Sequence, residues 1–104
     1  MWYVWYDDGM GTKVPDKRWT QIFKALANVN RVKIVKLLAA REKLSVTAIT
    51  EKLDISFNAT SRHLLILYAM GIVESKGTDN HVFYWLHPDM PADIRAIVRF
   101  VIDN

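Results

Sequence analysis

The chain has no cysteine in its 104 residues, and only four glycines and three prolines. Without cysteine it has no disulfide framework, no thiolate metal site and no thiol redox switch. No apolar run approaches the roughly 20 residues that span a bilayer. The opening MWYVWY is too short for a signal peptide and has no basic residues before it. The length fits one domain, and these absences predict a soluble, cytoplasmic protein with no membrane segment.

Positive charge is concentrated in one part of the chain. The net charge is only +3, but nine of the 14 Lys and Arg residues lie between positions 13 and 43, against two acidic residues there. A basic segment in an otherwise neutral chain indicates an anionic partner, with nucleic acid favoured over membrane. The alternative is an ordinary solvated helix face that carries lysines.

Apolar residues recur at helical spacing through most of the chain, and glycine, proline and polar clusters separate the repeats. Ser45 and Ser56 are in position to cap two of the helices, and Gly71 is expected to end one in the left-handed conformation. The helices are predicted at about 16–28, 30–41, 46–53, 57–70 and 91–102.

Between the last two helices the apolar period changes from 3.6 to 2. IVESK, GTDN and HVFYWL read as strand, turn and strand, which predicts a β-hairpin over residues 72–86. The fold class is therefore mainly α with a small β-hairpin, a winged helix-turn-helix of about five helices and a two-stranded wing. Residues 16–104 form this domain. Residues 1–15 form an aromatic N-terminal extension, expected to pack on the domain or on a dimer partner.

The helix predicted at 57–70 begins polar and continues apolar. At about 100° per residue, Thr60, Leu64 and Leu67 share the inward face, whereas Asn58 and Arg62 point away from the core. A polar surface is thus presented at the start of an anchored helix. Recognition helices contact base edges from their first turns, so this arrangement suits DNA reading.

The residue types fit that task. Arg62 can pair with a guanine edge and Asn58 with an adenine edge. Backbone N–H groups at the helix start can hold phosphate oxygens. The predicted DNA-binding residues are Ser56, Phe57, Asn58, Ala59, Ser61, Arg62 and His63 on or before the helix and Lys76 on the wing. Two outward apolar residues, Leu65 and Ile66, have no role in this picture.

Several stretches resemble the ArsR family of winged-helix transcriptional regulators: KALANVNRVKIVKLL, LSVTAITEKLDIS, SRHLLIL, GIVESKG and VFYWL. The resemblance covers about residues 20–88. It implies a homodimeric DNA-binding repressor that pairs through its first and last helices. The implied interface comprises Trp19, Ile22, Phe23, Ile94, Ile97, Val98 and Val101. The alternative is that this stripe packs only within its own subunit.

The chain departs from the family pattern in ways that bear on ligands and on DNA binding. Metal-sensing members have cysteines in the third helix, where this chain has Leu44-Ser45-Val46-Thr47, or Asp and His on the last helix, where it has only Asp93. No metal and no cofactor are therefore expected. Phe57 stands where the family often has a polar DNA contact, and Leu65 stands where it often has a lysine.

The functional prediction is a dimeric, sequence-specific DNA-binding transcriptional regulator, a repressor, whose partner is a pseudo-palindromic operator. It would read the major groove with helix 57–70 and flank the DNA with wing 72–86. The alternative is a protein–protein interaction module with weak, non-specific DNA binding, motivated by Phe57, Leu65, Ile66 and the N-terminal aromatic residues. An enzyme is not expected: Ser61 and His63 lie about 200° apart on the helix, and no phosphate-binding loop is present.

Overall fold

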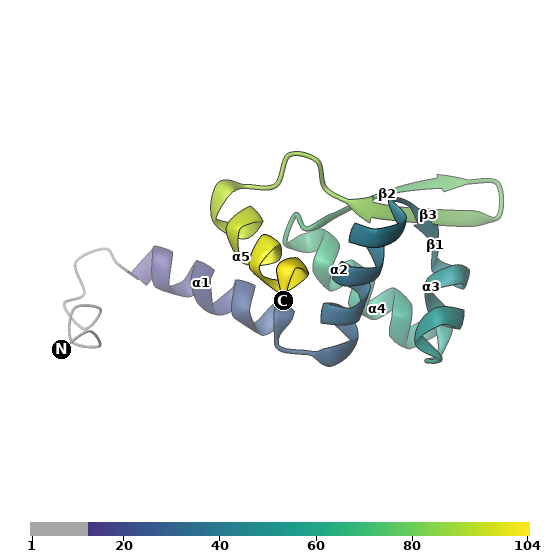
Figure 1. Ribbon diagram of the computed structural model, residues 1–104, viewed down its shortest axis with the longest axis horizontal. Coiled ribbons are helices and arrows are strands. Elements are labelled where there is room, and N and C mark those ends of the chain that lie inside the picture. The colour runs from purple at the N-terminus through teal and green to yellow at the C-terminus, as the bar shows by residue number, and fades with distance from the viewer. Residues whose placement is uncertain (1–12) are drawn as a thin grey trace.

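The computed structural model describes residues 13–104, with side chains from Lys17 onward. Within this range the predicted order of helices and hairpin is confirmed (Figure 1). The aromatic N-terminal extension was expected over residues 1–15. Its positions 1–12 lie outside the described residues, and positions 13–15 belong to the first helix. The elements are α1 (Lys13–Leu26), α2 (Val29–Arg41), β1 (Leu44–Ser45), α3 (Val46–Leu53), α4 (Phe57–Ala69), β2 (Val73–Thr78), β3 (His81–Leu86) and α5 (Ala92–Asp103).

Local chemistry accounts for where these helices begin. The side chain of Asn28 accepts hydrogen bonds from the backbone N–H groups of Asn30 and Arg31, which caps α2. The helix α1 begins at Lys13, three residues earlier than expected from the sequence. The sequence prediction left Pro15 in the N-terminal extension, but a proline in the first turn removes no helical hydrogen bond and is tolerated.

The wing is part of a three-stranded antiparallel sheet with the order β1-β3-β2. The strands β2 and β3 pair from Val73↔Leu86 to Thr78↔His81, as the hairpin prediction requires. The strand β1 was not predicted. It has only two residues, and it pairs Leu44 with Tyr84 on β3, so it provides no period-2 pattern that a sequence could display.

A single hydrophobic core joins the helices to the base of the wing. Its fully buried side chains come from α1, α2, α3, α4 and α5 and from the start of β2. The largest of them are Ile22, Ile34, Leu38, Ile49, Leu64, Leu67, Ile72 and Ile94. At about 25 cal/mol per Å² of buried apolar surface, this burial provides the main driving force for folding.

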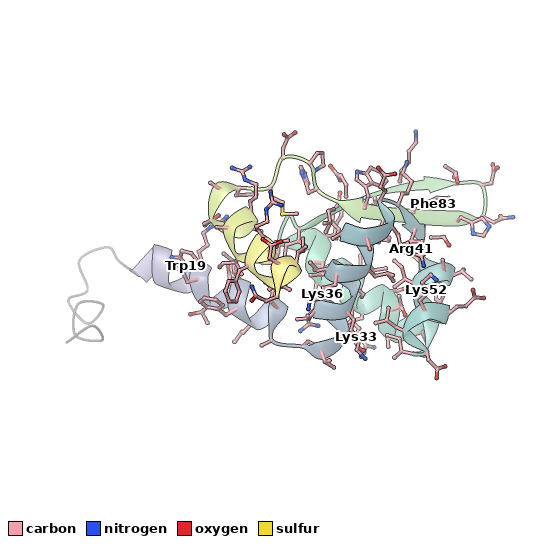
Figure 2. The ribbon with its side chains drawn as sticks, in the orientation of Figure 1. Trp19, Lys33, Lys36, Arg41, Lys52 and Phe83 are labelled. Atoms are coloured by element: carbon pink, nitrogen blue, oxygen red, sulfur yellow. The ribbon has the colours of Figure 1, made fainter. Side chains whose placement is uncertain are left out.

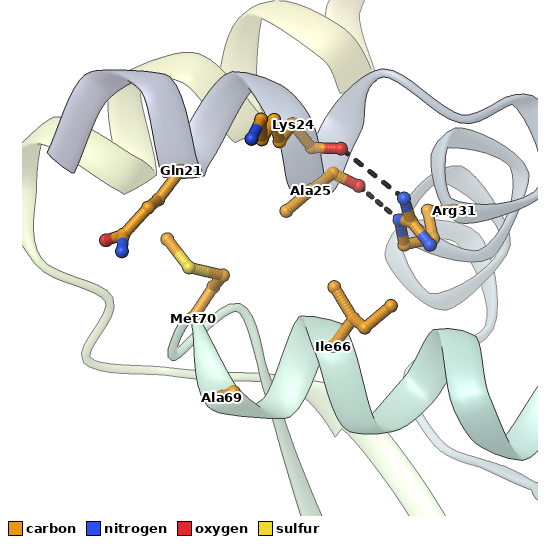
Figure 3. A pocket seen from close by; sticks show the side chains of 7 residues that line it. All are labelled: Gln21, Lys24, Ala25, Arg31, Ile66, Ala69 and Met70. Atoms are coloured by element: carbon orange, nitrogen blue, oxygen red, sulfur yellow. Dashed lines mark hydrogen bonds between the residues drawn. The ribbon is translucent and has the colours of Figure 1, made fainter. Parts of the chain in front are cut away.

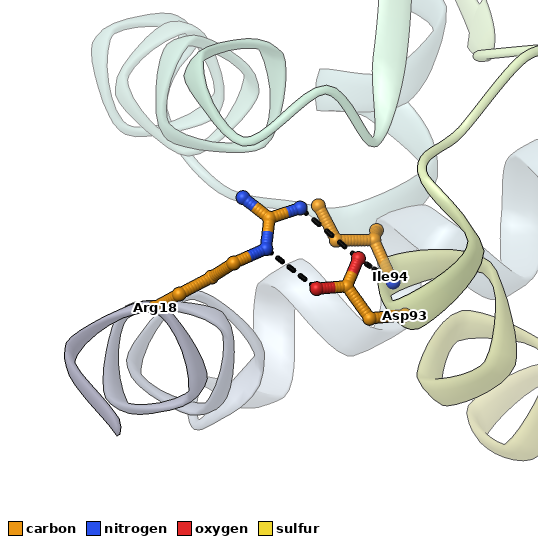
Figure 4. Close-up of polar contacts among 3 residues, drawn as sticks. All are labelled: Arg18, Asp93 and Ile94. Atoms are coloured by element: carbon orange, nitrogen blue, oxygen red, sulfur yellow. Dashed lines mark hydrogen bonds and ion pairs between the residues drawn. The ribbon is translucent and has the colours of Figure 1, made fainter. Parts of the chain in front are cut away.

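An ion pair joins the first helix to the last. Arg18 Nη2 donates to Asp93 Oδ1 at 3.0 Å, and Arg18 Nε donates to Asp93 Oδ2 (Figure 4). Asp93 Oδ1 also accepts from the backbone N–H of Ile94 at 2.8 Å. The ion pair thereby joins α1 to α5, which lie next to each other in Figure 1. In residues 13–104, no helix has both the length and the hydropathy that crossing a bilayer requires.

Candidate DNA-binding surface

Two helices and the tight turn between them build the candidate surface. Asp54 ends α3 in the left-handed conformation, with φ 55°. Two residues later the side chain of Ser56 accepts from the Ala59 N–H at 3.0 Å and caps α4. Ser45 caps α3 in the same way, accepting from the Ala48 N–H at 3.1 Å. Both caps are those that the sequence predicted.

One face of α4 is fixed in the core. Thr60, Leu64 and Leu67 are each 0% exposed, which confirms the predicted inward face. The hydroxyl of buried Thr60 donates to the Ser56 carbonyl at 2.9 Å, so its burial leaves no unsatisfied donor. This anchoring leaves Asn58 and Arg62 exposed on the opposite face, as predicted. The two side chains that can read bases therefore stand on a rigid support.

The other predicted DNA-binding residues at the start of α4 differ in their exposure to solvent and in their free hydrogen-bonding capacity. Phe57 is 54% exposed, so an aromatic ring stands at the first position of the helix. Ala59 and Ser61 are half-buried. The Ser56 hydroxyl is occupied as the cap, so its remaining capacity for a phosphate is as a donor.

His63 is turned toward the protein. Its Nδ1 lies 3.0 Å from Arg31 Nη1 on α2. Because a guanidinium can only donate, Nδ1 must accept, and the ring proton of the neutral imidazole lies on Nε2. Partial burial is the first cause that lowers the pKa of His63, and the charges of Arg31 and Arg62 lower it further. The imidazole thus forms a neutral link from α4 to α2.

The wing presents one of the predicted contacts. Lys76 is exposed on β2, opposite Phe83 of β3. The turn at the tip contains Asp79 with φ 40°. At the base of the wing, Lys43 Nζ lies 4.7 Å from the ring centroid of Trp85, a cation–π contact that connects the β1 segment to the sheet.

The basic segment divides into structural and free charges. Arg18 is paired with Asp93, Arg31 is bonded to backbone carbonyls, and Lys43 covers Trp85. Of the other cations among residues 17–43, Lys17, Lys24, Lys33, Lys36 and Arg41 are exposed, and Lys52 of α3 adds another. Figure 2 labels Lys33, Lys36, Arg41 and Lys52. These exposed cations add to the positive field of the segment, whereas the charge of Arg18 is compensated by Asp93.

Leu65 and Ile66, the two outward apolar residues of α4 without a predicted role, lie in different environments. Leu65 is 61% exposed and remains on the surface. Ile66 is half-buried and lines a cavity between α4 and α1. The helical period places both residues outward, but Ile66 lies on the flank of α4 that faces α1 across this cavity. The periodicity of a single helix does not reveal such a neighbour.

The residues predicted for the dimer interface fall into three groups by their exposure to solvent. Ile22, Ile94 and Val98 are at most 2% exposed, so the chain's own core already covers them. Trp19 and Phe23 are 40% and 56% exposed, and their rings stack with centroids 5.9 Å apart. The half-buried members are Ile97 and Val101.

Sequence reasoning missed two residues with a clear place at these surfaces. Phe100 on α5 is 68% exposed, the largest value among the exposed large apolar residues of the described chain. Its outward position is readable from the helical period. Arg31 was counted only as charge, and no sequence signal indicates its bond to His63, 32 positions away. Among residues 17–104, whose side chains the structure describes, no three His, Asp or Glu side chains gather as a metal site would require.

Comparison with known proteins agrees with this geometry. Residues 28–75 match the family described as bacterial regulatory protein, arsR family. The arsenic resistance transcriptional regulator ArsR1 of Pseudomonas putida is 34% identical over 82 residues, 79% of this chain and 64% of that protein. The arsenical resistance operon repressor of Escherichia coli is 38% identical over 78 residues, 75% of this chain and 67% of the repressor.

A solved structure shows the same architecture. The homodimeric winged helix-turn-helix DNA-binding domain from Mycobacterium bovis superposes with a TM-score of 0.72 at 23% identity, covering 90% of this chain and 83% of that domain. The chain spans less than two thirds of the length of the P. putida regulator, 64%. The fold is the winged helix-turn-helix, and the relatives are transcriptional regulators. The sequence matches and the fold together show that this chain belongs to the ArsR family of bacterial regulatory proteins.

Proposed function

We propose that this chain is a dimeric transcriptional regulator that binds a pseudo-palindromic operator and acts as a repressor in the cytoplasm. In this proposal α4 enters the major groove and the wing β2–β3 flanks the DNA. The observation that carries it is the placement of exposed Asn58 and Arg62 on the first turns of a helix whose other face is buried. The repressor role follows the name of the E. coli relative.

Arg62 is the residue expected to read sequence. Its planar guanidinium can donate two parallel hydrogen bonds to a guanine edge, a geometry that no other base pair offers as well. Ser61 and the first backbone N–H groups of α4 would hold phosphates. Lys76 would contact the backbone or the minor groove from the wing, which contributes affinity but no sequence information.

Exposed apolar side chains on α1 and α5 support the dimer in this proposal. The exposed aromatic pair Trp19 and Phe23 on α1 and exposed Phe100 on α5 leave apolar surface on the two helices that Arg18 and Asp93 join. Apolar patches of this kind mark interaction sites. A two-fold dimer through α1 and α5 would present two copies of α4, and their half-sites would lie about one helical turn, roughly 34–36 Å, apart.

The experiment is selection of binding sites from a random duplex pool at about 150 mM salt, where phosphate contacts alone give weak binding. Wild type is compared with Arg62→Ala and with Arg99→Ala, which removes an exposed arginine from α5. Wild type and Arg99→Ala should enrich the same palindrome. Arg62→Ala should lose about 1–3 kcal/mol and specificity at one base pair of each half-site.

An unchanged consensus for Arg62→Ala would remove Arg62 from base reading. Lys76→Ala serves as a second comparison, since loss of a phosphate contact should weaken all sequences alike and lower the salt slope by about 1. If the wild-type protein enriches no sequence at all, the proposed regulator function is wrong.

A further inference from the structure

A groove of about 500 Å³ lies between α1 and α4, at a place the proposed DNA contacts do not use. Its lining combines apolar side chains with two cations and one amide (Figure 3). The lining residues are Gln21, Lys24, Ala25, Arg31, Ile66, Ala69 and Met70. Small-molecule sites have volumes of about 300–1,000 Å³ and this same composition, a mainly apolar wall with a few polar groups.

The charge at the groove has no acidic partner. Arg31 donates from Nε to the Ala25 carbonyl, from Nη2 to the Lys24 carbonyl at 3.4 Å, and from Nη1 to neutral His63. None of these acceptors is a carboxylate, and across residues 17–104 neither Arg31 nor Lys24 belongs to an ion pair. A half-buried guanidinium whose charge is balanced only by dipoles favours an anion.

The groove lies on a different flank of α1 from the surface proposed for the dimer. At about 100° per residue, Ala25 lies on one side of buried Ile22, and Trp19 and Phe23 lie on the other. On α4, the lining residues Ile66, Ala69 and Met70 lie one to about two turns after Arg62, toward the C-terminal end of the helix. Pairing through Trp19 and Phe23, or contact of DNA with the first turn of α4, therefore involves residues that do not line the groove.

We propose that this groove binds a small carboxylate with an apolar body, which sets its carboxylate against Arg31 and Lys24 and its body against Ile66 and Met70. A carboxylate forms a stronger, charge-assisted hydrogen bond with a guanidinium than a neutral imidazole does. The bound anion therefore competes with His63 for Arg31 Nη1, and it loosens the link between α4 and α2. DNA affinity falls as a result. This last step rests on the proposed function; the binding itself does not.

The binding test uses the full chain, without DNA, and follows the methyl groups of Ala25, Ile66 and Met70 by ¹³C NMR during titration with benzoate. Benzyl alcohol has the same ring without the charge, and acetate has the charge without the ring. Benzoate should shift these methyl signals in a saturable way. Both comparison compounds should bind at least about tenfold more weakly, a difference of about 1.4 kcal/mol.

Matched variants locate the site. Ala69→Phe fills the groove from an exposed position on α4 and should abolish the benzoate shifts. Lys24→Gln should weaken benzoate binding severalfold, and Lys17→Gln, an exposed lysine of the same helix outside the groove, should not change it. Absence of saturable shifts with benzoate, or equal binding of benzyl alcohol, would overturn the proposal.

The effect of benzoate on DNA affinity is measured separately, with the duplex that the wild-type protein selects. Saturating benzoate should weaken binding by wild type and leave binding by Ala69→Phe unchanged. If benzoate fills the groove while DNA affinity stays constant, the coupling through His63 is wrong and the binding site stands. If the chain selects no duplex, the regulator function fails, and the methyl titration still decides whether the groove binds carboxylates.

Discussion

Arg18 and Asp93 face each other across 75 positions of sequence and form a two-point ion pair between α1 and α5. The hydrogen bonds from the Arg18 guanidinium are the main cause that lowers the pKa of Asp93 to about 2, and the backbone N–H of Ile94 assists. Neither helix is held to the other by another ion pair within residues 17–104. The orientation of the proposed dimer surface therefore depends partly on this contact.

The stabilisation from this pair should vanish in acid. A carboxyl with a lowered pKa in the folded state stabilises the fold above its unfolded pKa of about 3.8, and the benefit is lost as the pH falls toward about 2. Asp93→Asn should therefore lower the unfolding midpoint at pH 7 and have little effect near pH 2. Glu51→Gln, at an exposed position of α3, is the control. Denaturant titrations across this range measure the difference, and a pH-independent effect of Asp93→Asn would contradict it.

Adjacent leucines on α4 provide a test of the packing. Leu64 is 0% exposed and Leu65 is 61% exposed. Leu64→Ala should destabilise the protein by about 2–5 kcal/mol, because it removes buried methyl groups and leaves a cavity. Leu65→Ala should change the free energy of unfolding by no more than about 0.5 kcal/mol, as for ordinary surface sites. Urea unfolding of the two variants measures both free energies. Similar losses of stability would mean that Leu65 is covered in solution.

Substitutions at two glycines distinguish the effect of backbone conformation from the effect of the space available for a side chain. Gly71 follows α4 with φ 75°, and an added Cβ would meet only Pro91 Cδ at 3.9 Å, an ordinary contact. Gly71→Ala should therefore cost about 1–2 kcal/mol through backbone strain alone. Gly77→Ala, in β2, has comparable space and no positive φ, so it should be neutral or slightly stabilising. Equal thermal shifts for the two variants would show that Gly71 is not needed for its conformation.

Elements defined by local chemistry were predictable from the sequence. The caps at Ser45 and Ser56, the end of α4 before Gly71 and the inward face of α4 each depend on residues within one or two turns of one another. Their partners are in the same helix, so spacing alone identifies them. The hairpin was predictable for the same reason, because its two strands are joined by a short polar turn.

Features that depend on distant segments were not predictable. The strand β1 exists only because Leu44 pairs with Tyr84, and Ile66 lines a groove whose opposite wall is α1. The bond of His63 to Arg31 turned a predicted DNA contact toward the protein. Each of these relationships is set by tertiary packing, which overrides the local pattern and which single-sequence periodicity does not encode.

The surface of α5 provides the test of dimerisation. Phe100 is 68% exposed and lies on the helix proposed to pair, whereas Val29 is 65% exposed and begins α2. In a two-fold dimer each substitution occurs twice, so Phe100→Glu removes two apolar side chains and places two charges at the interface. It should weaken the dimer by far more than about tenfold, since burying one phenylalanine contributes about 1.5–3 kcal/mol. Val29→Glu should leave self-association unchanged. Sedimentation equilibrium of the two variants measures this, and an intact Phe100→Glu dimer would mean that the subunits pair through another face.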